Sequence, residues 1–480
     1  MGNLPQSRRS TRSNKGSGFD LAVIGAGSAG FSAAITAADQ GALVALIGFG
    51  AIGGTCVNVG CVPSKTLIRA TETLHQARSA GRFEGIRATA EVEDWQAIIA
   101  GKDELVASLR RAKYEDLLAA YNMIDYLEGK ARIVEGGVAV NGNSIDADKV
   151  IIATGSSPAA PSIPGIEAVS YLTSTTALQL KELPESLLVI GGGYIGCELA
   201  QVFSRAGVKV TLVCRSRLLP GAEPEISRAL TGYFRDEGMT VLDSLEYRDI
   251  GRTGEGVVLS VVRDGTGERI EAEQVLATAG RRPNTRDLGL EEAAIGLGPN
   301  GAIMVDDRMR TTKNGIYAAG DVTGLDQFVY MAAYGAKLAA QNALNGDQRV
   351  YDNRAMPWVV FTDPQLGGVG ISEADAIKKG LSVRTSVLPL DRLPRALAAR
   401  DTRGLIKLVA ERGSNCLLGA QVLAPEGADS IQTAALAIKL NLSITDLAEM
   451  IFPYLTTVEG LKLAAQSFDM DISRLPCCAG

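Results

Sequence analysis

One arrangement occurs twice in this chain: a short apolar run, a glycine-rich turn, and a segment with helical spacing that leads into a second apolar run. The first copy begins at residues 19–24 and the second at residues 186–190. Three glycines have the same spacing in both turns, namely Gly25, Gly27 and Gly30 in the first and Gly191, Gly193 and Gly196 in the second. The first glycine of such a turn permits a tight bend, the second lets the backbone approach a pyrophosphate, and the third lets the helix pack on the strand. Because the N-terminus of that helix faces the phosphates, the sequence predicts two dinucleotide-binding βαβ units and two bound nucleotides.

The end of the second apolar run in each unit indicates which nucleotide binds. In the downstream unit, Arg215 and Arg217 follow residues 208–213, where an acid would bind the ribose hydroxyls of NAD. Guanidinium groups suit a 2′-phosphate, so this unit is predicted to bind NADPH. In the upstream unit the matching position is Gly48, and nothing in the sequence explains why the acid is missing there.

Charge and composition exclude several classes of partner. With 48 Lys and Arg against 54 Asp and Glu, the net charge of −6 gives no long-range attraction for nucleic acid or anionic lipid. No apolar stretch reaches the roughly 18 residues of a membrane span, so we expect no stable membrane association. Seven cysteines are too few for a secreted disulfide scaffold, which favours a reducing, cytoplasmic location. A single histidine in 480 residues leaves little imidazole chemistry for catalysis.

Cys56 and Cys61 follow the first βαβ unit, in the run GGTCVNVGCVPSK. Two cysteines at this spacing can close a small disulfide ring, and a helix start beside them would favour thiolate. A zinc half-site is the alternative, but the sequence has no second cysteine pair of comparable spacing, and redox use is favoured. Lys65 lies one helical turn beyond Cys61, where its charge would be close to the same centre.

Four motifs together resemble the flavin-dependent pyridine nucleotide-disulfide oxidoreductases from about residue 19 onward: GTCVNVGCVPSK, ATGSSP, ATAGRRPN and IYAAGD. The resemblance implies that Cys61 is the thiol in charge-transfer contact with FAD and that Cys56 is the interchange thiol. It also implies that Lys65, paired with Glu198, lies by the flavin ring. Asp321 would hydrogen-bond the ribityl-phosphate part. Further flavin-contact positions, some through backbone only, match Gly30, Gly50, Thr55, Ala131, Thr154, Arg281 and Val329.

Tyr194, in the second glycine-rich turn, matches the residue that shields the flavin until nicotinamide arrives. Members of the family that reduce organic disulfides have a C-terminal histidine that protonates the departing thiolate. Tyr454 occupies that position here, five residues before Glu459. A tyrosine with an ordinary pKa around 10 is a poor proton donor and acceptor at neutral pH, so acid-base work on a leaving thiol is not expected.

Two adjacent cysteines, Cys477 and Cys478, lie among the last five residues of the chain. Two soft thiolates on a terminal arm suit capture and transfer of a soft metal ion. This tail and the run FPYLTTVEGLKLAAQSF resemble the Hg(II)-reducing members of the family. The resemblance implies that the tail of one subunit takes Hg(II) from thiol complexes and passes it to Cys56 and Cys61 of the other subunit, for reduction to Hg(0). Tyr114 and Tyr454 would line the metal's path, with Glu459 also counted in the catalytic set.

Two other functions stay open at this point. The first is reduction of an organic disulfide by the same flavin chemistry, against which the missing histidine argues. The second is a non-enzymatic metal buffer that uses the C-terminal thiols, for which two complete nucleotide motifs would be hard to explain.

The expected fold class is α/β, with two Rossmann-like dinucleotide-binding domains and a C-terminal α+β dimerisation domain. Residues 1–18 have the polar, basic composition of a disordered leader. The FAD-binding domain is predicted to be discontinuous, and the tail's reach to the disulfide implies a homodimer with shared active sites. The predicted boundaries are 19–155 and 280–350 for the FAD domain, 156–279 for the NADPH domain, and 351–480 for the dimerisation domain with its metal-binding tail.

Overall fold

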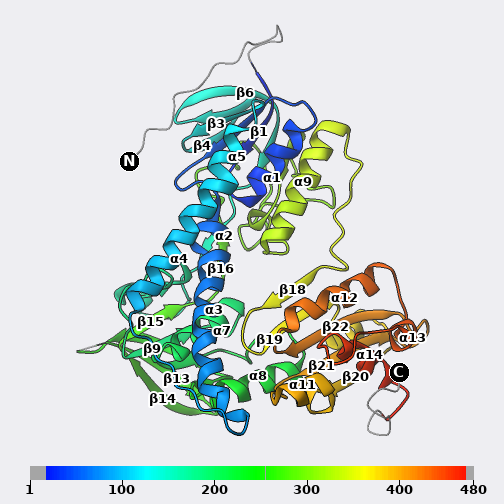
Figure 1. Ribbon diagram of the computed structural model, residues 1–480. Coiled ribbons are helices and arrows are strands. Elements are labelled where there is room, and N and C mark those ends of the chain that lie inside the picture. The colour runs from blue at the N-terminus through cyan, green and yellow to red at the C-terminus, as the bar shows by residue number, and fades with distance from the viewer. Residues whose placement is uncertain (1–17, 255, 472–480) are drawn as a thin grey trace. The chain divides into compact units, whose positions relative to one another are not determined.

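The computed structural model describes residues 18–254 and 256–471, and Figure 1 shows their elements. The chain divides into two compact units. The first contains Met1–Pro63, Asp103–Ser157 and Arg281–Tyr351, and the second contains Ser64–Lys102, Pro158–Gly280 and Asp352–Gly480. The predictions for the leader, apart from Gly18, and for Cys477 and Cys478 lie outside the described residues.

The first unit is built on a parallel sheet with the strand order β3-β2-β1-β6 and with β17 beside β6. The parallel strands are β1 (Phe19–Ile24), β2 (Val44–Gly48), β3 (Ile124–Glu128), β6 (Asn143–Ile152) and β17 (Ile316–Ala318). The sheet continues through an antiparallel hairpin, β4 (Ala131–Val134) and β5 (Gly137–Val140). Apolar side chains on both faces of β1 and β2 are buried, which is why these runs have no polar alternation.

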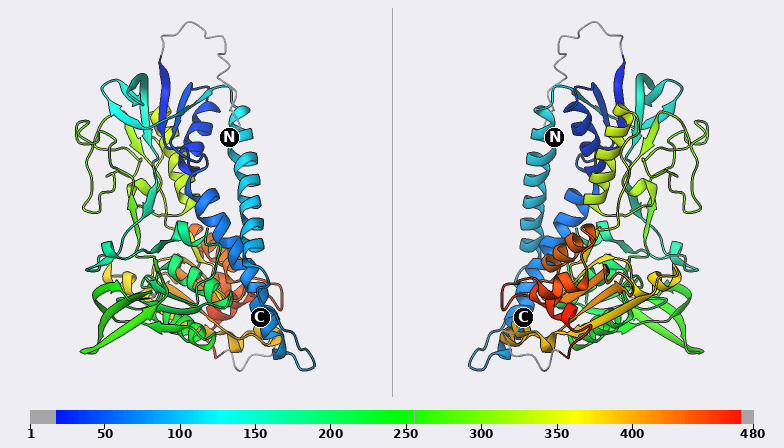
Figure 2. Two further views of the ribbon diagram at one scale, coloured as in Figure 1. Left: turned by 90° about the vertical axis from the view of Figure 1, so that its left-hand side faces the viewer. Right: turned by 90° about the vertical axis from the view of Figure 1, so that its right-hand side faces the viewer.

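Helices α1 (Ser28–Ala38) and α9 (Val329–Asn345) lie side by side on one face of this sheet (Figure 2). Both are rich in buried alanine, whose small side chain lets the helices approach each other closely. Helix α2 (Gly54–Val59), a π-helical turn (Arg111–Glu115) and α5 (Asp116–Ala119) also belong to the first unit, whereas α3 (Cys61–Arg78) and α4 (Trp95–Arg110) contain residues of both units. The chain leaves and re-enters the first unit through β7 (Ser156–Pro158) and β16 (Arg281–Pro283), which form a two-stranded sheet.

The second unit contains the second nucleotide-type sheet, with the strand order β11-β10-β9-β15-β8, all parallel. Its strands are β8 (Leu172–Thr173), β9 (Ser186–Ile190), β10 (Lys209–Val213), β11 (Thr240–Leu242) and β15 (Gln274–Ala277). The helices of this part are α6 (Ser174–Ala177), α7 (Tyr194–Arg205) and α8 (Pro224–Asp236). An antiparallel meander follows: β12 (Glu246–Arg252), β13 (Val257–Arg263) and β14 (Thr266–Ala272).

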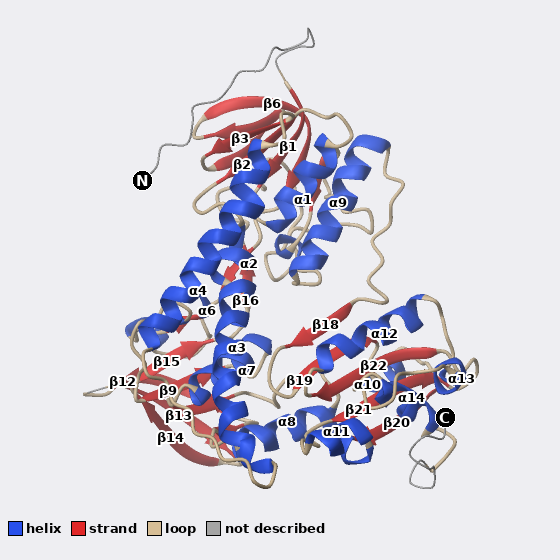
Figure 3. Cartoon of the chain, viewed as in Figure 1, coloured by secondary structure: helices blue, strands red, loops and turns tan. Residues whose placement is uncertain are grey.

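The C-terminal part of the second unit is an antiparallel sheet with the order β18-β19-β22-β21-β20. Figure 3 shows its strands in red and its helices in blue. The strands are β18 (Pro357–Val360), β19 (Gln365–Gly370), β20 (Val383–Pro389), β21 (Leu405–Glu411) and β22 (Leu417–Ala424). The helices are α10 (Glu373–Lys378), α11 (Pro394–Ala399), α12 (Gly427–Lys439), α13 (Ile444–Glu449) and α14 (Glu459–Gln466). The cis bond Asp363–Pro364 lies between strands β18 and β19.

A buried ion network ties these parts of the second unit together. Arg205 donates 2.8 Å hydrogen bonds to both carboxylate oxygens of Glu237 and a 2.9 Å hydrogen bond to Asp363. Arg403 lies 3.2 Å from the other Asp363 oxygen. His75 has a carboxylate of Glu237 on one side and of Asp363 on the other, each 3.9 Å away. The single histidine of the chain therefore belongs to a structural ion network.

The predicted fold class is confirmed: two Rossmann-like sheets and a C-terminal α+β part are present in the described residues. The division into three domains stays a prediction, since contacts group residues 64–102 and the last two predicted domains into one unit. Among the described residues, no helix combines the length and the apolar character needed to cross a membrane.

Candidate active site

The first glycine-rich turn forms a backbone cradle at the carboxyl end of β1. Gly25 has a φ of +121°, and a Cβ atom there would collide with the carbonyl oxygen of Ala153. A Cβ on Gly30 would collide with the carbonyl oxygen of Gly25, so only glycine lets α1 start this close to the turn. On the other side, a Cβ on Gly54 would lie 2.6 Å from the Cα of Gly27. Because no side chain projects from these glycines, backbone N–H groups at the start of α1 are accessible to a pyrophosphate.

Cys56 lies in α2, Cys61 is the first residue of α3, and both side chains are half-buried. Tyr114, from the π-helical turn, interacts with this pair. Its hydroxyl lies 3.4 Å from Ser28 Oγ, and its ring packs edge-on against Phe31 with centroids 4.9 Å apart. Burial raises the pKa of Tyr114, and the charges of Cys56 and Cys61 raise it further against the opposing hydrogen bond to Ser28. Tyr114 is therefore a neutral phenol beside the two sulfurs at physiological pH.

Arg281 belongs to a polar cluster and interacts electrostatically with Cys61. It donates to the hydroxyl and the carbonyl oxygen of Ser156, both at 2.7 Å, and Ser156 Oγ donates to Asp321 at 2.6 Å. Burial lowers the pKa of Arg281, while the charges of Asp321 and Cys61 raise it. A guanidinium that interacts with Cys61 favours the thiolate form of that cysteine.

Thr154 is fixed by a residue that sequence reasoning missed. Its hydroxyl donates to the carbonyl oxygen of Asn284 at 2.7 Å, and Asn284 Nδ2 donates back to the carbonyl oxygen of Thr154 at 2.9 Å. Ser157 Oγ donates to the side-chain oxygen of Asn284 at 2.7 Å. The only signal for Asn284 and Ser156 in the sequence is their place in the motifs ATAGRRPN and ATGSSP.

The other sequence-predicted flavin positions also lie in the first unit. Gly50 follows β2 with a φ of +82°, Thr55 lies in α2, Ala131 begins β4, and Val329 begins α9. The glycine cradle and the Ser156–Asp321–Arg281 cluster fit a flavin dinucleotide: the first accepts a pyrophosphate, and the second offers charged and hydroxyl groups to a polar chain.

Gly48 now has a structural explanation. It is the last residue of β2, and a Cβ there would collide with the hydroxyl of Tyr126 and lie 2.8 Å from the Cβ of Ala26. An acid at this position has no room for its first side-chain atom. The side chain of Tyr126, on the neighbouring strand β3, thus occupies the space that a carboxylate at residue 48 would need.

In the second unit, Lys65 and Glu198 form the ion pair that the family resemblance implied. Lys65 Nζ lies 2.7 Å from one oxygen of Glu198, whose side chain is buried, and the other oxygen accepts a 2.9 Å hydrogen bond from the backbone N–H of Phe361. The ammonium also lies 4.8 Å from the centroid of the Phe361 ring. Phe361 was not predicted, because nothing in its sequence neighbourhood indicates a contact with α3 or α7.

The second glycine-rich turn repeats the geometry of the first. Gly191 has a φ of +120°, and a Cβ on Gly196 would collide with the carbonyl oxygen of Gly191. Thr278 donates from its hydroxyl to the carbonyl oxygens of Ile190 and Gly191, at 3.1 and 3.0 Å. Gly193 is the N-cap of α7, so the N-terminus of this helix also opens onto the turn.

Tyr194, the first residue of α7, stacks on Trp358 of β18 with ring centroids 5.5 Å apart and planes inclined by 20°. Burial raises the pKa of Tyr194 to about 12. Trp358 is packed in turn against Gly368 on β19, where a Cβ would collide with the indole ring. Tyr194, which the family resemblance matches to a flavin-shielding residue, is therefore a neutral ring held by a second ring from the C-terminal sheet.

Arg215 and Arg217 have different environments. Arg215 is exposed, donates to the carbonyl oxygen of Ser162 at 3.0 Å, and lies 5.2 Å from the ring centroid of Tyr247. Arg217 donates to the carbonyl oxygens of Pro220 and Ala222, at 2.9 and 2.7 Å. Arg215 thus presents its charge to solvent at the end of β10, while Arg217 organises its own loop.

Tyr454 and Glu459 lie in the C-terminal part of the second unit, whereas the two cysteines belong to the first unit. Tyr454 is 45% exposed, and Glu459 begins α14. Glu459 accepts a 3.1 Å hydrogen bond from the backbone N–H of Leu455, and burial raises the pKa of its carboxyl.

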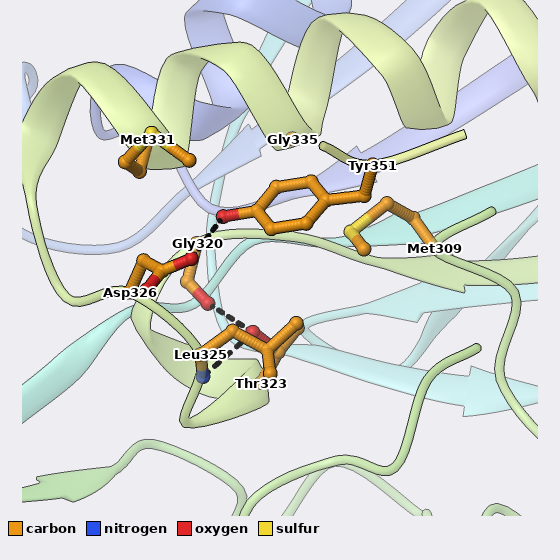
Figure 4. Close-up of a pocket in the computed structure, with 8 residues that line it drawn as sticks. All are labelled: Met309, Gly320, Thr323, Leu325, Asp326, Met331, Gly335 and Tyr351. Atoms are coloured by element: carbon orange, nitrogen blue, oxygen red, sulfur yellow. Dashed lines mark hydrogen bonds between the residues drawn. The ribbon is translucent and has the colours of Figure 1, made fainter. Parts of the chain in front are cut away.

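A small cavity in the first unit lies beside α9 (Figure 4). Tyr351 donates to Asp326 at 3.0 Å, and Thr323 donates to the carbonyl oxygen of Gly320 at 2.8 Å. The cavity volume is about 10 Å³, room for one water. It is therefore too small to admit an organic substrate.

The chain was compared with known proteins. A sequence model of the pyridine nucleotide-disulphide oxidoreductase family matches residues 19–341, and a model of that family's dimerisation domain matches residues 356–465. A mercuric reductase of Streptomyces lividans is 47% identical and covers 96% of this chain and 99% of its own length. Mercuric reductases of Staphylococcus aureus and Shigella flexneri are 44% and 46% identical and cover 99% and 98% of this chain, with 87% and 85% of their own lengths matched.

Solved structures with a similar fold agree with these sequence matches. A Cu(II) complex of the HOCl-induced flavoprotein disulfide reductase RclA from Escherichia coli has a TM-score of 0.82 at 31% identity, covering 94% of this chain and 99% of its own. LpdA from Mycobacterium tuberculosis has a TM-score of 0.80 at 28% identity, covering 94% of this chain and 100% of its own. The family implies FAD and a nicotinamide dinucleotide as cofactors, and the dimerisation-domain match supports a homodimer. The two nucleotide-type folds and the cysteine pair agree with these matches, and the chain belongs to the pyridine nucleotide-disulphide oxidoreductase family.

Proposed function

We propose that this protein reduces Hg(II) to Hg(0) with electrons from NADPH, through FAD and the Cys56/Cys61 pair. The observation that carries the proposal is the setting of that pair. Both half-buried sulfurs interact with a neutral tyrosine and Cys61 also with an arginine, in a chain whose only histidine lies in an ion network. The mercuric reductases that match this chain over nearly its whole length support the same reaction.

The chemistry of the residues agrees with a metal substrate. Thiolates are the ligands that soft metal ions prefer, so Cys56 and Cys61 would bind Hg(II) as a pair. Arg281 favours the thiolate form of Cys61 by its positive charge. NADPH becomes NADP⁺ by giving up two electrons and one proton. Hg²⁺ takes up the two electrons to become the neutral metal, and the proton is released to solvent, so the substrate needs no proton. Tyr114 can line the path without acting as an acid, since burial raises its pKa.

The cofactors follow from the two nucleotide-type units. We assign FAD to the first unit, with Gly25, Gly27 and Gly30 for its pyrophosphate and the Asp321–Arg281 cluster for its polar chain. When bound, FAD would accept the two electrons of NADPH and pass them on. We assign NADPH to the second turn, where the exposed Arg215 suits a 2′-phosphate. Lys65 and Glu198 would lie by the flavin ring and hold charge there, and Tyr194 would shield the flavin until NADPH binds.

We further propose a homodimer with two shared sites. Cys477 and Cys478 of one subunit would take Hg(II) from small thiols and pass it to Cys56 and Cys61 of the other by successive thiolate exchange. Tyr454 would lie on this path. The free thiolates that this transfer requires favour a reducing, cytoplasmic compartment.

An anaerobic titration tests the proposal. The purified, flavin-containing protein is reduced with NADPH, Hg(II) is added with excess small thiol, and flavin absorbance and volatile mercury are followed together. We expect stoichiometric reoxidation of the flavin and release of Hg(0). Glutathione disulfide and lipoamide serve as comparison substrates: rapid turnover of either, with no mercury released, would replace the proposal by organic disulfide reduction.

A further inference from the structure

The upstream βαβ unit lacks the acid that normally binds the adenosine ribose of a dinucleotide. In this class of fold a carboxylate at the end of the second strand hydrogen-bonds the ribose hydroxyls. Gly48 ends that strand here and has no side chain to offer. A unit with a complete glycine cradle and no ribose ligand would bind its dinucleotide weakly, so another residue at this edge of the sheet is needed.

The neighbouring strand β3 fills the vacant place. The hydroxyl of Tyr126 lies where the Cβ of a side chain at residue 48 would be. In the parallel register of β2 and β3, Gly48 is paired with Glu128. Since side chains two residues apart in a strand lie on the same face, Tyr126 and Glu128 both project on the side from which the acid is missing. The charge of Glu128 reaches the phenol: burial raises the pKa of Tyr126, and Glu128 raises it further.

The position of Glu128 is fixed by its backbone. The N–H of Gly129 donates to the carbonyl oxygen of Gly48 at 2.8 Å, which joins the ends of β2 and β3. Asn141 closes the loop: its Oδ1 accepts from the N–H of Lys130 at 3.0 Å, and its Nδ2 donates to the carbonyl oxygen of Glu128 at 3.2 Å. The side chain of Glu128 is exposed, so its carboxylate is accessible to a ligand.

The same edge carries an exposed aromatic ring. Phe49, the residue after Gly48, is 72% exposed, and the ammonium of Lys130 lies 5.2 Å from its ring centroid. The carboxyl ends of β2 and β3 therefore carry a carboxylate, a phenol hydroxyl and an exposed apolar ring, at the edge of a parallel sheet at which nucleotides bind. This combination matches the hydroxyls and the base of an adenosine.

We propose that Glu128 and Tyr126, on β3, bind the adenosine ribose of FAD in place of the acid that Gly48 cannot supply. Glu128 accepts a hydrogen bond from a ribose hydroxyl, and the hydroxyl of Tyr126 lies beside the same group. The inference rests on the assignment of FAD to the first unit, and it adds the specific ligands of the ribose.

The affinity of the holoenzyme for FAD tests this inference without recourse to turnover. Release of FAD on dilution is followed by the rise in flavin fluorescence, for wild type and for Glu128→Gln and Tyr126→Phe. The matched control is Asp125→Asn, an exposed acid on the opposite face of the same strand. We expect Glu128→Gln to weaken FAD binding about tenfold, Tyr126→Phe to weaken it severalfold, and the control to leave it unchanged.

A second arm identifies the ribose as the group that is bound. Wild type and Glu128→Gln are loaded with a FAD analogue that lacks the 2′-hydroxyl of the adenosine. Wild type should bind the analogue about tenfold more weakly than FAD, and the variant should bind both alike. Equal FAD affinity of Glu128→Gln and wild type, or an undiminished preference for FAD in the variant, would overturn the inference and leave the proposed function intact. A wild-type protein that binds no FAD would overturn both.

Discussion

Lys65 of α3 and Glu198 of α7 form a 2.7 Å ion pair, although 133 residues separate them in the sequence. The Glu198 side chain is 6% exposed and also accepts from the backbone N–H of Phe361, while Lys65 lies over the Phe361 ring. The buried carboxylate therefore depends on two donors, of which Lys65 is the charged one.

Lys65→Met should lower stability and slow reduction of the flavin by NADPH. The variant leaves Glu198 buried with only the backbone donor, at a cost of about 2 kcal/mol. We expect a lower unfolding midpoint and about tenfold slower flavin reduction in stopped-flow absorbance. The double variant Lys65→Met/Glu198→Met should recover the stability, because it removes the unpaired buried charge. It should not recover the rate of flavin reduction, because the charged groups beside the flavin are still missing.

The exposed pair Arg69–Glu72 provides the control for that experiment. Arg69 and Glu72 lie on the same helix, with side-chain exposures of 59% and 23%. An exposed ion pair contributes less than about 1 kcal/mol, so Arg69→Met should change neither quantity measurably. A loss as large as that of Lys65→Met would contradict a special role for the buried pair.

Cys61→Ala should abolish the long-wavelength absorbance that a thiolate gives beside oxidised flavin. Cys56→Ala should retain it, because Cys61 begins α3 and interacts with Arg281. The measurement is the visible spectrum of two-electron-reduced protein. Cys416→Ala, at a half-buried thiol in the second unit, is the control and should resemble wild type. Charge-transfer absorbance that survives in Cys61→Ala would reverse the assignment of the two cysteines.

Replacing Cys477 and Cys478 together by alanine should impair turnover mainly when Hg(II) arrives tightly bound to small thiols. The soft thiolates of the tail are then needed to compete for the metal. We expect the rate to fall about tenfold with a large excess of thiol and to change little with weakly complexed Hg(II). A uniform loss under both conditions would point to a role other than metal capture.

Arg215→Ala should raise KM for NADPH about tenfold and leave KM for NADH nearly unchanged. Its guanidinium is exposed beside Tyr247 and would meet a 2′-phosphate that NADH does not have. Arg217→Ala should affect both dinucleotides equally, since Arg217 donates to carbonyl oxygens of its own loop. Initial rates measured with NADPH and with NADH give both KM values. An equal rise in the two KM values for Arg215→Ala would show that Arg215 does not distinguish NADPH from NADH.

The stability of the protein should decrease as the pH is lowered, because His75 becomes protonated more readily in the unfolded chain than in the folded protein. Burial lowers the pKa of His75 below 6.5, and Arg205 lowers it further against the charges of Glu237 and Asp363. Below pH 6.5 the unfolded chain takes up a proton that the folded protein resists, so stability is lost as pH falls from 6.5 toward the folded pKa. Because the chain has one histidine, His75→Gln should make the unfolding midpoint less dependent on pH between pH 7 and 5.5. An unchanged pH dependence in this variant would show that other groups cause the loss of stability.

The glycine-rich turns could be predicted from the sequence because the backbone conformations that require glycine are set by neighbouring residues. The positive φ of Gly25 and Gly191, and the close approaches at Gly30 and Gly196, are conditions that only glycine meets, and they recur at a fixed spacing after a strand. The redox pair was readable for the same reason, since Cys56 and Cys61 are near in the chain. The pairing of Lys65 with Glu198, by contrast, came from the resemblance to a known family and not from periodicity, and the partners of Arg281 were not predicted.

The sequence by itself determined the two βαβ units, the cysteine pair and the absence of a histidine acid from the C-terminal motif. Only the tertiary structure decided which distant residues meet: Tyr126 and Gly48, Trp358 and Tyr194, and the ion network around His75. The physical reason is that such contacts join segments far apart in the chain, and strand register and helix packing set their geometry. A single sequence does not determine strand register or helix packing, whereas neighbouring residues are enough to indicate a strand, a turn and the start of a helix.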